Sequence, residues 1–227
     1  MYEPFEELLT KIFKSYVVVT PTTTLGSAAA LPVLLQDGDL VLMDFFAHNS
    51  LLAPVLAKGD MVTTKRIYHN DMDKLEKEIQ KAENDPKINN IWYIADGMYS
   101  SDGSVCDVKK IEYLLNKYQN FYAYIDDAHG CSIIGKNGCG YVLSHFDKHP
   151  DKLVVILGFC KAFGMGCGAA IVLPNKEWQR KIQVCGPTNI FSGPIPTPML
   201  AAGIALAKIH LTPEIKLLQD KLYESFA

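Results

Sequence analysis

The sequence contains no apolar run long enough to cross a membrane. A spanning helix needs about 20 consecutive apolar residues, and no stretch of the 227 residues approaches that length. The first segment, MYEPFEELLTK, is acidic and lacks the basic and apolar regions of a signal peptide. We therefore expect a cytoplasmic protein with no membrane association.

An excess of basic residues is also absent, as is any pair of closely spaced cysteines. The net charge is -3, so nucleic acid and anionic lipid are not the expected partners. The six cysteines are irregularly spaced and contain no C-x-x-C pair, which disfavours a zinc site or a disulfide framework and favours reduced thiols. A small molecule is therefore the expected partner.

Short apolar runs alternate with amphipathic segments along the chain, which is 48% hydrophobic and 21% charged. Helical spacing of apolar residues predicts helices over 4–16, from about Leu25, over 71–84 and 108–118, and from Pro194 onward. Strands are predicted at 17–19, 40–44, 90–96, 121–126, 152–158 and 168–174. The alternation predicts an α/β fold with a mostly parallel sheet covered on both faces. Ligands of such sheets bind at the carboxyl ends of the strands.

Two acids and a histidine stand at the end of one predicted strand. Asp126, Asp127 and His129 follow the apolar run FYAYI, and a buried carboxylate there needs a cation nearby. That cation could be a metal ion, in which case His48 would complete a hydrolase site, or a protonated ring nitrogen. The plainer alternative is a turn or helix cap built from acids.

Lys161 lies between an apolar strand and the glycine-rich turn GMGCG. We expect its amine to be shielded from water, because a desolvated amine loses its proton more easily and can form a Schiff base. The alternative is an ordinary surface lysine. The glycines do not follow the first strand of a βαβ unit, so a dinucleotide site is disfavoured.

Hydroxyls and imidazoles precede several predicted helices. Thr22, Thr23 and Thr24 stand at a helix start, where backbone N–H groups favour a phosphate, although simple capping would also explain them. His48 follows the strand that ends at Asp44, which places it at the same edge of the sheet. His69 begins a helix through HND, and capping explains that group.

Taken together, the motifs resemble the α-oxoamine synthases, pyridoxal 5'-phosphate (PLP) enzymes of aminotransferase fold type I. The matching stretches, in the family's order, are DGD to HNSL (37–51), HNDMDKLE (69–76), GMYSSDGS (97–104), YIDDAHGCSIIGKNGCG (124–140) and GFCKAFGMGCGAAIV (158–172). The resemblance covers nearly the whole chain. It implies a three-layer α/β/α large domain.

The resemblance also implies a role for four of these side chains. Lys161 would bond covalently to PLP and later move protons at the substrate α-carbon. Asp126 would pair with the pyridinium nitrogen, which keeps the cofactor an electron sink. His129 would hydrogen-bond the phenolic oxygen of the ring, and His48 would stack on the ring face. Lys161 and His129 are therefore the predicted catalytic residues.

Further positions match the family's phosphate and cofactor contacts only in part. Ser100 matches a serine near the cofactor, and Thr23 and Thr24 fall where the family holds the phosphate through backbone N–H groups. Gly158 replaces a threonine that usually contacts the phosphate, and Ser27 replaces an asparagine. The Ser-Thr pair that reaches the phosphate across the dimer reads here as Ser192-Gly193. We expect weaker phosphate binding, which Thr22 to Thr24 would partly offset.

The implied activity is condensation of an amino acid with an acyl-CoA, with decarboxylation, in a homodimer. Residues 1–193 would form the PLP-binding large domain without the family's N-terminal segment. Residues 194–227 would form an interdomain helical segment, with most of the C-terminal small domain absent. Four alternatives keep the fold: an aminotransferase, a lyase, an autoinducer-type synthase, and an inactive truncated homologue that binds a partner.

Overall fold

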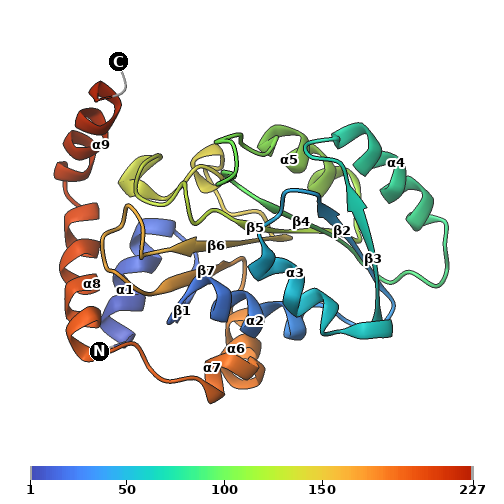
Figure 1. The fold of residues 1–227 in the computed structure, drawn as a ribbon, viewed down its shortest axis with the longest axis horizontal. Coiled ribbons are helices and arrows are strands. Elements are labelled where there is room, and N and C mark those ends of the chain that lie inside the picture. Colours follow the sequence, from blue (N-terminus) through green and yellow to red (C-terminus); the bar gives the residue numbers. More distant parts are fainter. Residues whose placement is uncertain (1, 226–227) are drawn as a thin grey trace.

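A seven-stranded sheet forms the centre of the computed structural model, which describes residues 2–225 (Figure 1). The strand order is β1-β7-β6-β5-β4-β2-β3. Strands β3, β2, β4, β5 and β6 run parallel, and β7 and β1 are antiparallel to their neighbours. The strands are β1 (Tyr16–Thr20), β2 (Asp39–Asp44), β3 (Val62–Ile67), β4 (Ile91–Asp96), β5 (Phe121–Asp126), β6 (Leu153–Gly158) and β7 (Ala169–Leu173). The predicted mostly parallel sheet is confirmed.

Helices cover both faces of the sheet (Figure 1). One face packs against α1 (Tyr2–Phe13), α4 (Met72–Glu83), α5 (Val108–Lys117) and α8 (Thr197–His210). The other packs against α2 (Thr23–Leu34), α3 (Asn49–Leu56) and α6 (Lys176–Cys185), beside which lies α7 (Pro187–Phe191). The chain then continues from α8 into α9 (Glu214–Glu224) at one end of the molecule. Within residues 2–225, no helix has the length and apolarity needed to span a bilayer.

The central strands are apolar on both faces, as a sheet between two helical layers requires. In β4, Tyr93 and Ala95 point into the core beneath α4 and α5, whereas Trp92 and Ile94 point into the core beneath α2 and α3. Strand β3, VTTKRI, was not predicted. It lies at the edge of the sheet with its middle residues partly exposed, so the apolar run typical of a buried strand is missing.

The carboxyl ends of the parallel strands meet at one edge of the sheet. Strands β2, β4, β5 and β6 end at Asp44, Asp96, Asp126 and Gly158. In the sheet register Asp96 lies beside Asp126. The fold therefore gathers three buried acids from three strands at the edge where ligands of such sheets bind.

Candidate active site

Burial controls the charge of the strand-end acids. Asp126 is 6% exposed, and burial raises the pKa of its carboxyl, although a hydrogen bond from the backbone N–H of Ala128 (3.0 Å) and the nearby Lys161 oppose the rise. Burial also raises the pKa of the Asp96 carboxyl to about 7, and the negative charge of the nearby Asp126 contributes to this rise. A cation bound on the solvent side of these two neighbouring carboxyls would therefore stabilise their ionised forms.

Lys161 and His129 meet above this edge. The amine Nζ of Lys161 forms a hydrogen bond with Nε2 of His129, which follows β5 by three residues. Burial, together with the nearby Lys161, lowers the pKa of the His129 imidazole and favours its neutral form. Lys161 itself is exposed, so the expectation that its amine is shielded from water is wrong for the chain as described. The glycines of its loop, Gly164 and Gly166, have positive φ, a backbone conformation that glycine adopts without a steric cost.

His48 joins the same group through its backbone and its neighbour Ser50. It caps α3, where Nδ1 accepts the backbone N–H of Ser50 (3.2 Å) and lies 2.8 Å from the Ser50 hydroxyl. Its backbone N–H donates to Asp96 (3.0 Å), and His48 and Ser50 are both among the groups that oppose the rise in the pKa of Asp126. His48 is exposed, so its imidazole can approach a ligand from the side of α3.

The start of α2 lies against the end of β6. A Cβ atom built on Gly158 would come within 3.2 Å of the Thr23 side chain and 3.1 Å of Ala128, so the missing side chain lets α2 approach the loop after β5. Thr22 caps α2 by accepting the N–H of Leu25 (3.1 Å). The capping alternative therefore holds for Thr22, and Thr23 and Thr24 remain in the first turn, where helix N–H groups lack intrahelical partners.

Two of the aligned serines point elsewhere. Ser27 is buried and hydrogen-bonds the Tyr124 hydroxyl (3.1 Å), and the Ser192 hydroxyl donates to the carbonyl of Thr188 (2.5 Å). Ser100 is exposed in the turn after β4, and among the described residues no hydrogen bond joins it to Lys161, His129 or His48.

His69 has a structural role beside the site. Its Nδ1 lies 3.1 Å from the buried Asp44 carboxylate, its Nε2 lies 2.9 Å from the Ser104 hydroxyl, and its ring stacks on Phe46. Helix α4 is capped by Asp71, which accepts the N–H of Lys74 (2.9 Å). The capping explanation of the HND segment is therefore confirmed.

The Asp127 side chain is enclosed by Gly97 and by the loop that follows β5. Its carboxylate accepts the backbone N–H of Val142 (2.9 Å), and burial raises its pKa to about 8. Within residues 2–225 no three His, Cys, Asp or Glu side chains group as a metal site requires. The arrangement gives no support to the metal-hydrolase alternative, which needs Asp127 together with Asp126 and the histidines.

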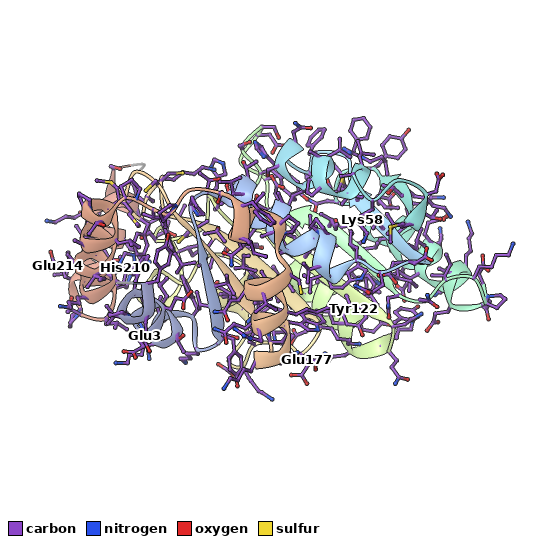
Figure 2. All side chains as sticks on the ribbon, turned by 90° about the horizontal axis from the view of Figure 1, so that it is seen from below. Glu3, Lys58, Tyr122, Glu177, His210 and Glu214 are labelled. Atoms are coloured by element: carbon purple, nitrogen blue, oxygen red, sulfur yellow. The ribbon has the colours of Figure 1, made fainter. Side chains whose placement is uncertain are left out.

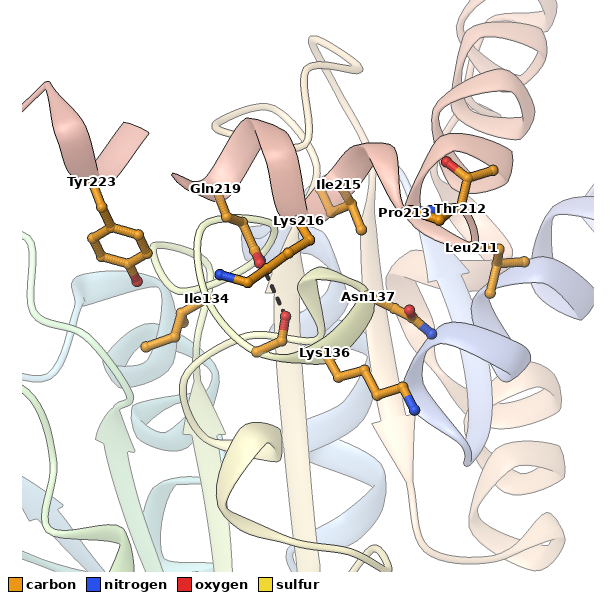
Figure 3. Close-up of a pocket in the computed structure, with 11 residues that line it drawn as sticks. Ile134, Lys136, Asn137, Leu211, Thr212, Pro213, Ile215, Lys216, Gln219 and Tyr223 are labelled. Atoms are coloured by element: carbon orange, nitrogen blue, oxygen red, sulfur yellow. Dashed lines mark hydrogen bonds between the residues drawn. The ribbon is translucent and has the colours of Figure 1, made fainter. Parts of the chain in front are cut away.

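Sequence reasoning missed Asp96 and Ser50. A signal existed for Asp96, because the run NIWYIAD ends in an acid just as FYAYID does, and both strands are parallel. Ser50 carried no comparable signal. A pocket of about 670 Å³ between α9 and the loop 134–137 (Figure 3) is lined by neither Lys161 nor Asp126 and is separate from this group.

Comparison with known proteins identifies the family of this chain. The family model for aminotransferase class I and II matches residues 2–223. An 8-amino-7-oxononanoate synthase from Hydrogenovibrio crunogenus is 35% identical over 190 residues, which cover 83% of this chain and 46% of the relative. Serine palmitoyltransferase 2 from Caenorhabditis elegans is 31% identical over 175 residues, which cover 74% of this chain and 30% of the relative. Both are α-oxoamine synthases, and the predicted resemblance is confirmed.

Solved structures share the fold. A variant of serine palmitoyltransferase from S. paucimobilis, determined with a bound PLP–myriocin aldimine, superposes with a TM-score of 0.84 at 19% identity, and the match covers 98% of this chain and 55% of that one. An 8-amino-7-oxononanoate synthase from Francisella tularensis gives 0.72 at 20% identity and covers 94% and 58%. The predicted α/β/α fold of type I is confirmed. The chain spans less than half the length of the two curated relatives above.

Proposed function

Since the chain belongs to the aminotransferase class I and II family, we propose that it binds PLP and condenses an amino acid with an acyl-CoA, releasing carbon dioxide and CoA. The observation that carries the proposal is the hydrogen bond between Lys161 and His129 close to the buried Asp126. An amine, a neutral imidazole and a buried acid at the carboxyl edge of a parallel sheet suit a cationic ring that also carries an aldehyde.

The residues present fit the cofactor. Asp126 is buried, and burial raises the pKa of its carboxyl. A protonated ring nitrogen would stabilise the ionised carboxylate, because the two opposite charges would then form a pair. Thr23 and Thr24 open α2, whose N-terminus suits the phosphate. Gly158 leaves room there but offers no hydroxyl. Exposed His48 would lie on the ring face, and Ser100 would approach from the turn after β4.

Bound PLP supplies an electron sink that stabilises negative charge at the α-carbon of the amino acid. Binding of the cofactor, proton transfer and orientation would depend on residues of this chain. Lys161 Nζ would hold the cofactor and would move the proton at the α-carbon. His129 would donate to the phenolic oxygen, and its hydrogen bond orients the Lys161 amine. Asp126 would hold the proton on the ring nitrogen, and Ser50 is one of the groups that favour the ionised form of that carboxylate.

We also propose a domain division, a homodimer and a cytoplasmic location. Residues 1–193 would form the PLP-binding domain, and residues 194–227, which contain α8 and α9, would lead toward a second domain. The resemblance supports a homodimer. The six cysteines are unpaired, which favours a reducing compartment such as the cytoplasm.

The reaction is tested by measuring two products at once. With PLP, carboxyl-labelled glycine, alanine or serine, and acetyl-CoA or palmitoyl-CoA, we expect labelled carbon dioxide and free CoA thiol to appear in equal amounts. Lys161→Ala is expected to lower both rates at least about 10³-fold, because the amine that moves the proton is lost.

Lys176→Ala is the matched control, since Lys176 is an exposed lysine on α6 outside the site, and its rates should equal those of the unaltered chain. Absence of both products would contradict the proposed acyltransferase. A 2-oxo acid formed without CoA release would instead assign the protein to the aminotransferases.

A further inference from the structure

His210 is a buried histidine at the end of α8 that the proposed chemistry does not use. It is 4% exposed and lies, like Glu214 four residues later, at the end of the molecule that α8 and α9 form (Figure 2). Its ring contacts two loops that are distant from it in the sequence, one carrying His129 and the other carrying Lys161.

The contact with the first loop is a hydrogen bond to Ser132, three residues after His129. The Nδ1 of His210 lies 2.8 Å from the carbonyl of Leu206 and donates to it, so Nε2 is the acceptor for the Ser132 hydroxyl. Burial lowers the pKa of His210, which favours this neutral form. Ser132 has a φ of 74°, a left-handed conformation that surrounding contacts must maintain.

Helix α9 holds the same loop from a second side. The buried Gln219 amide donates to the carbonyls of Ser132 (3.0 Å) and Gly135 (3.1 Å), the latter drawn in Figure 3. A Cβ atom on Gly138 would come within 2.8 Å of the His210 ring, so this loop closes tightly around the imidazole. The loop after β5 is therefore fixed at its far end by α8 and α9.

The contact with the second loop is a ring stack on Phe163, two residues after Lys161. The His210 and Phe163 rings are 4.4 Å apart between centroids, with an angle of 21° between their planes. Phe163 in turn packs on Phe159, at the start of the Lys161 loop, with 4.4 Å between centroids. One imidazole thus touches both segments whose side chains meet in the bond between Lys161 and His129.

We propose that His210 is a positioning residue that holds the His129 loop and the Lys161 loop in the register in which Lys161 and His129 hydrogen-bond. The role of that pair in catalysis rests on the proposed function, but the mechanical link does not. Loss of the imidazole removes both contacts at once. With the Nε2–H of the neutral His129 as donor, the bond occupies the lone pair of the Lys161 amine, so its loss makes that amine more reactive.

The link is tested by the reactivity of Lys161 toward limiting N-hydroxysuccinimidyl acetate, read by peptide mass spectrometry relative to Lys176. His210→Leu is expected to raise this ratio about fivefold, the effect of losing one hydrogen bond. His145→Leu is the matched control, because His145 also bonds the carbonyl four residues before it (2.8 Å) and packs on a tyrosine, Tyr141. Its ratio should stay within about twofold of the unaltered chain.

An unchanged Lys161 ratio in a folded His210→Leu protein would overturn the proposal and leave His210 as an anchor of α8 alone. If circular dichroism shows that this variant is unfolded, Ser132→Ala decides, since it removes only the hydroxyl that bonds the ring. A rise of at least about twofold supports the link, and no rise overturns it. The labelling needs no PLP, so a chain that takes up no cofactor would contradict the proposed function without affecting this result.

Discussion

Asp126→Asn is expected to weaken PLP binding by about two to four orders of magnitude, because a buried ion pair that loses one partner costs about 3–5 kcal/mol. Asparagine has the shape of aspartate and can still accept the N–H of Ala128, so the loop after β5 should keep its structure. What it cannot do is carry the charge that a protonated ring nitrogen requires. Equilibrium titration with PLP, followed by absorbance, gives the dissociation constants.

Asp151→Asn serves as the control for this prediction, since Asp151 is an exposed aspartate that precedes β6, at the end of that strand opposite the one that Lys161 follows. Its affinity for PLP should match that of the unaltered chain. Equal PLP affinities for Asp126→Asn and Asp151→Asn would show that Asp126 does not pair with the ring.

Gly130→Ala is expected to lower the free energy of unfolding by about 3 kcal/mol, at the upper end of the range for overpacked sites. A Cβ atom there would lie 2.2 Å from Oδ1 of Asp127 and 2.7 Å from the backbone N of Tyr141. Asp127 is fully buried, and Gly97 and Gly140 also surround its carboxylate, so the displaced groups have little room to move. Urea unfolding measures the change.

Gly193→Ala is the matched substitution, because nothing lies within 4 Å of a Cβ at that position and its φ is not in the left-handed region. Its free energy of unfolding should change by no more than about 0.5 kcal/mol. If Gly130→Ala were as stable as Gly193→Ala, the close packing around Asp127 would be refuted.

Much of the fold was predictable because its central strands are buried on both faces and read as short apolar runs. The runs ending at Asp44, Asp96 and Asp126 all form strands, and the helices predicted over 71–84 and 108–118 form as α4 and α5, whereas the short helix α3 was not predicted. The edge strand β3 escaped prediction because its exposed side carries Thr63, Lys65 and other polar residues. Burial, not intrinsic strand preference, made the others recognisable.

The site was predictable where chain order determines position. Residues at the ends of parallel strands must meet at one edge, so Asp126 and His48 could be placed from the sequence. The exposure of Lys161 could not, since it depends on what covers the loop after β6. Nor could His210, whose contact with Ser132 joins residues 78 positions apart through the packing of α8. Contacts of that kind leave no periodic signal in the sequence.

Covalent attachment of PLP to Lys161 is tested most directly by reduction and peptide mapping. Sodium borohydride converts the carbon–nitrogen double bond between the PLP aldehyde and a lysine amine into a stable single bond. After incubation with excess PLP and reduction, we expect the phosphopyridoxyl group on Lys161 and on no other lysine in comparable yield. Reduction that leaves Lys161 unlabelled, or that labels exposed lysines such as Lys176 equally, would contradict a PLP site at this edge of the sheet.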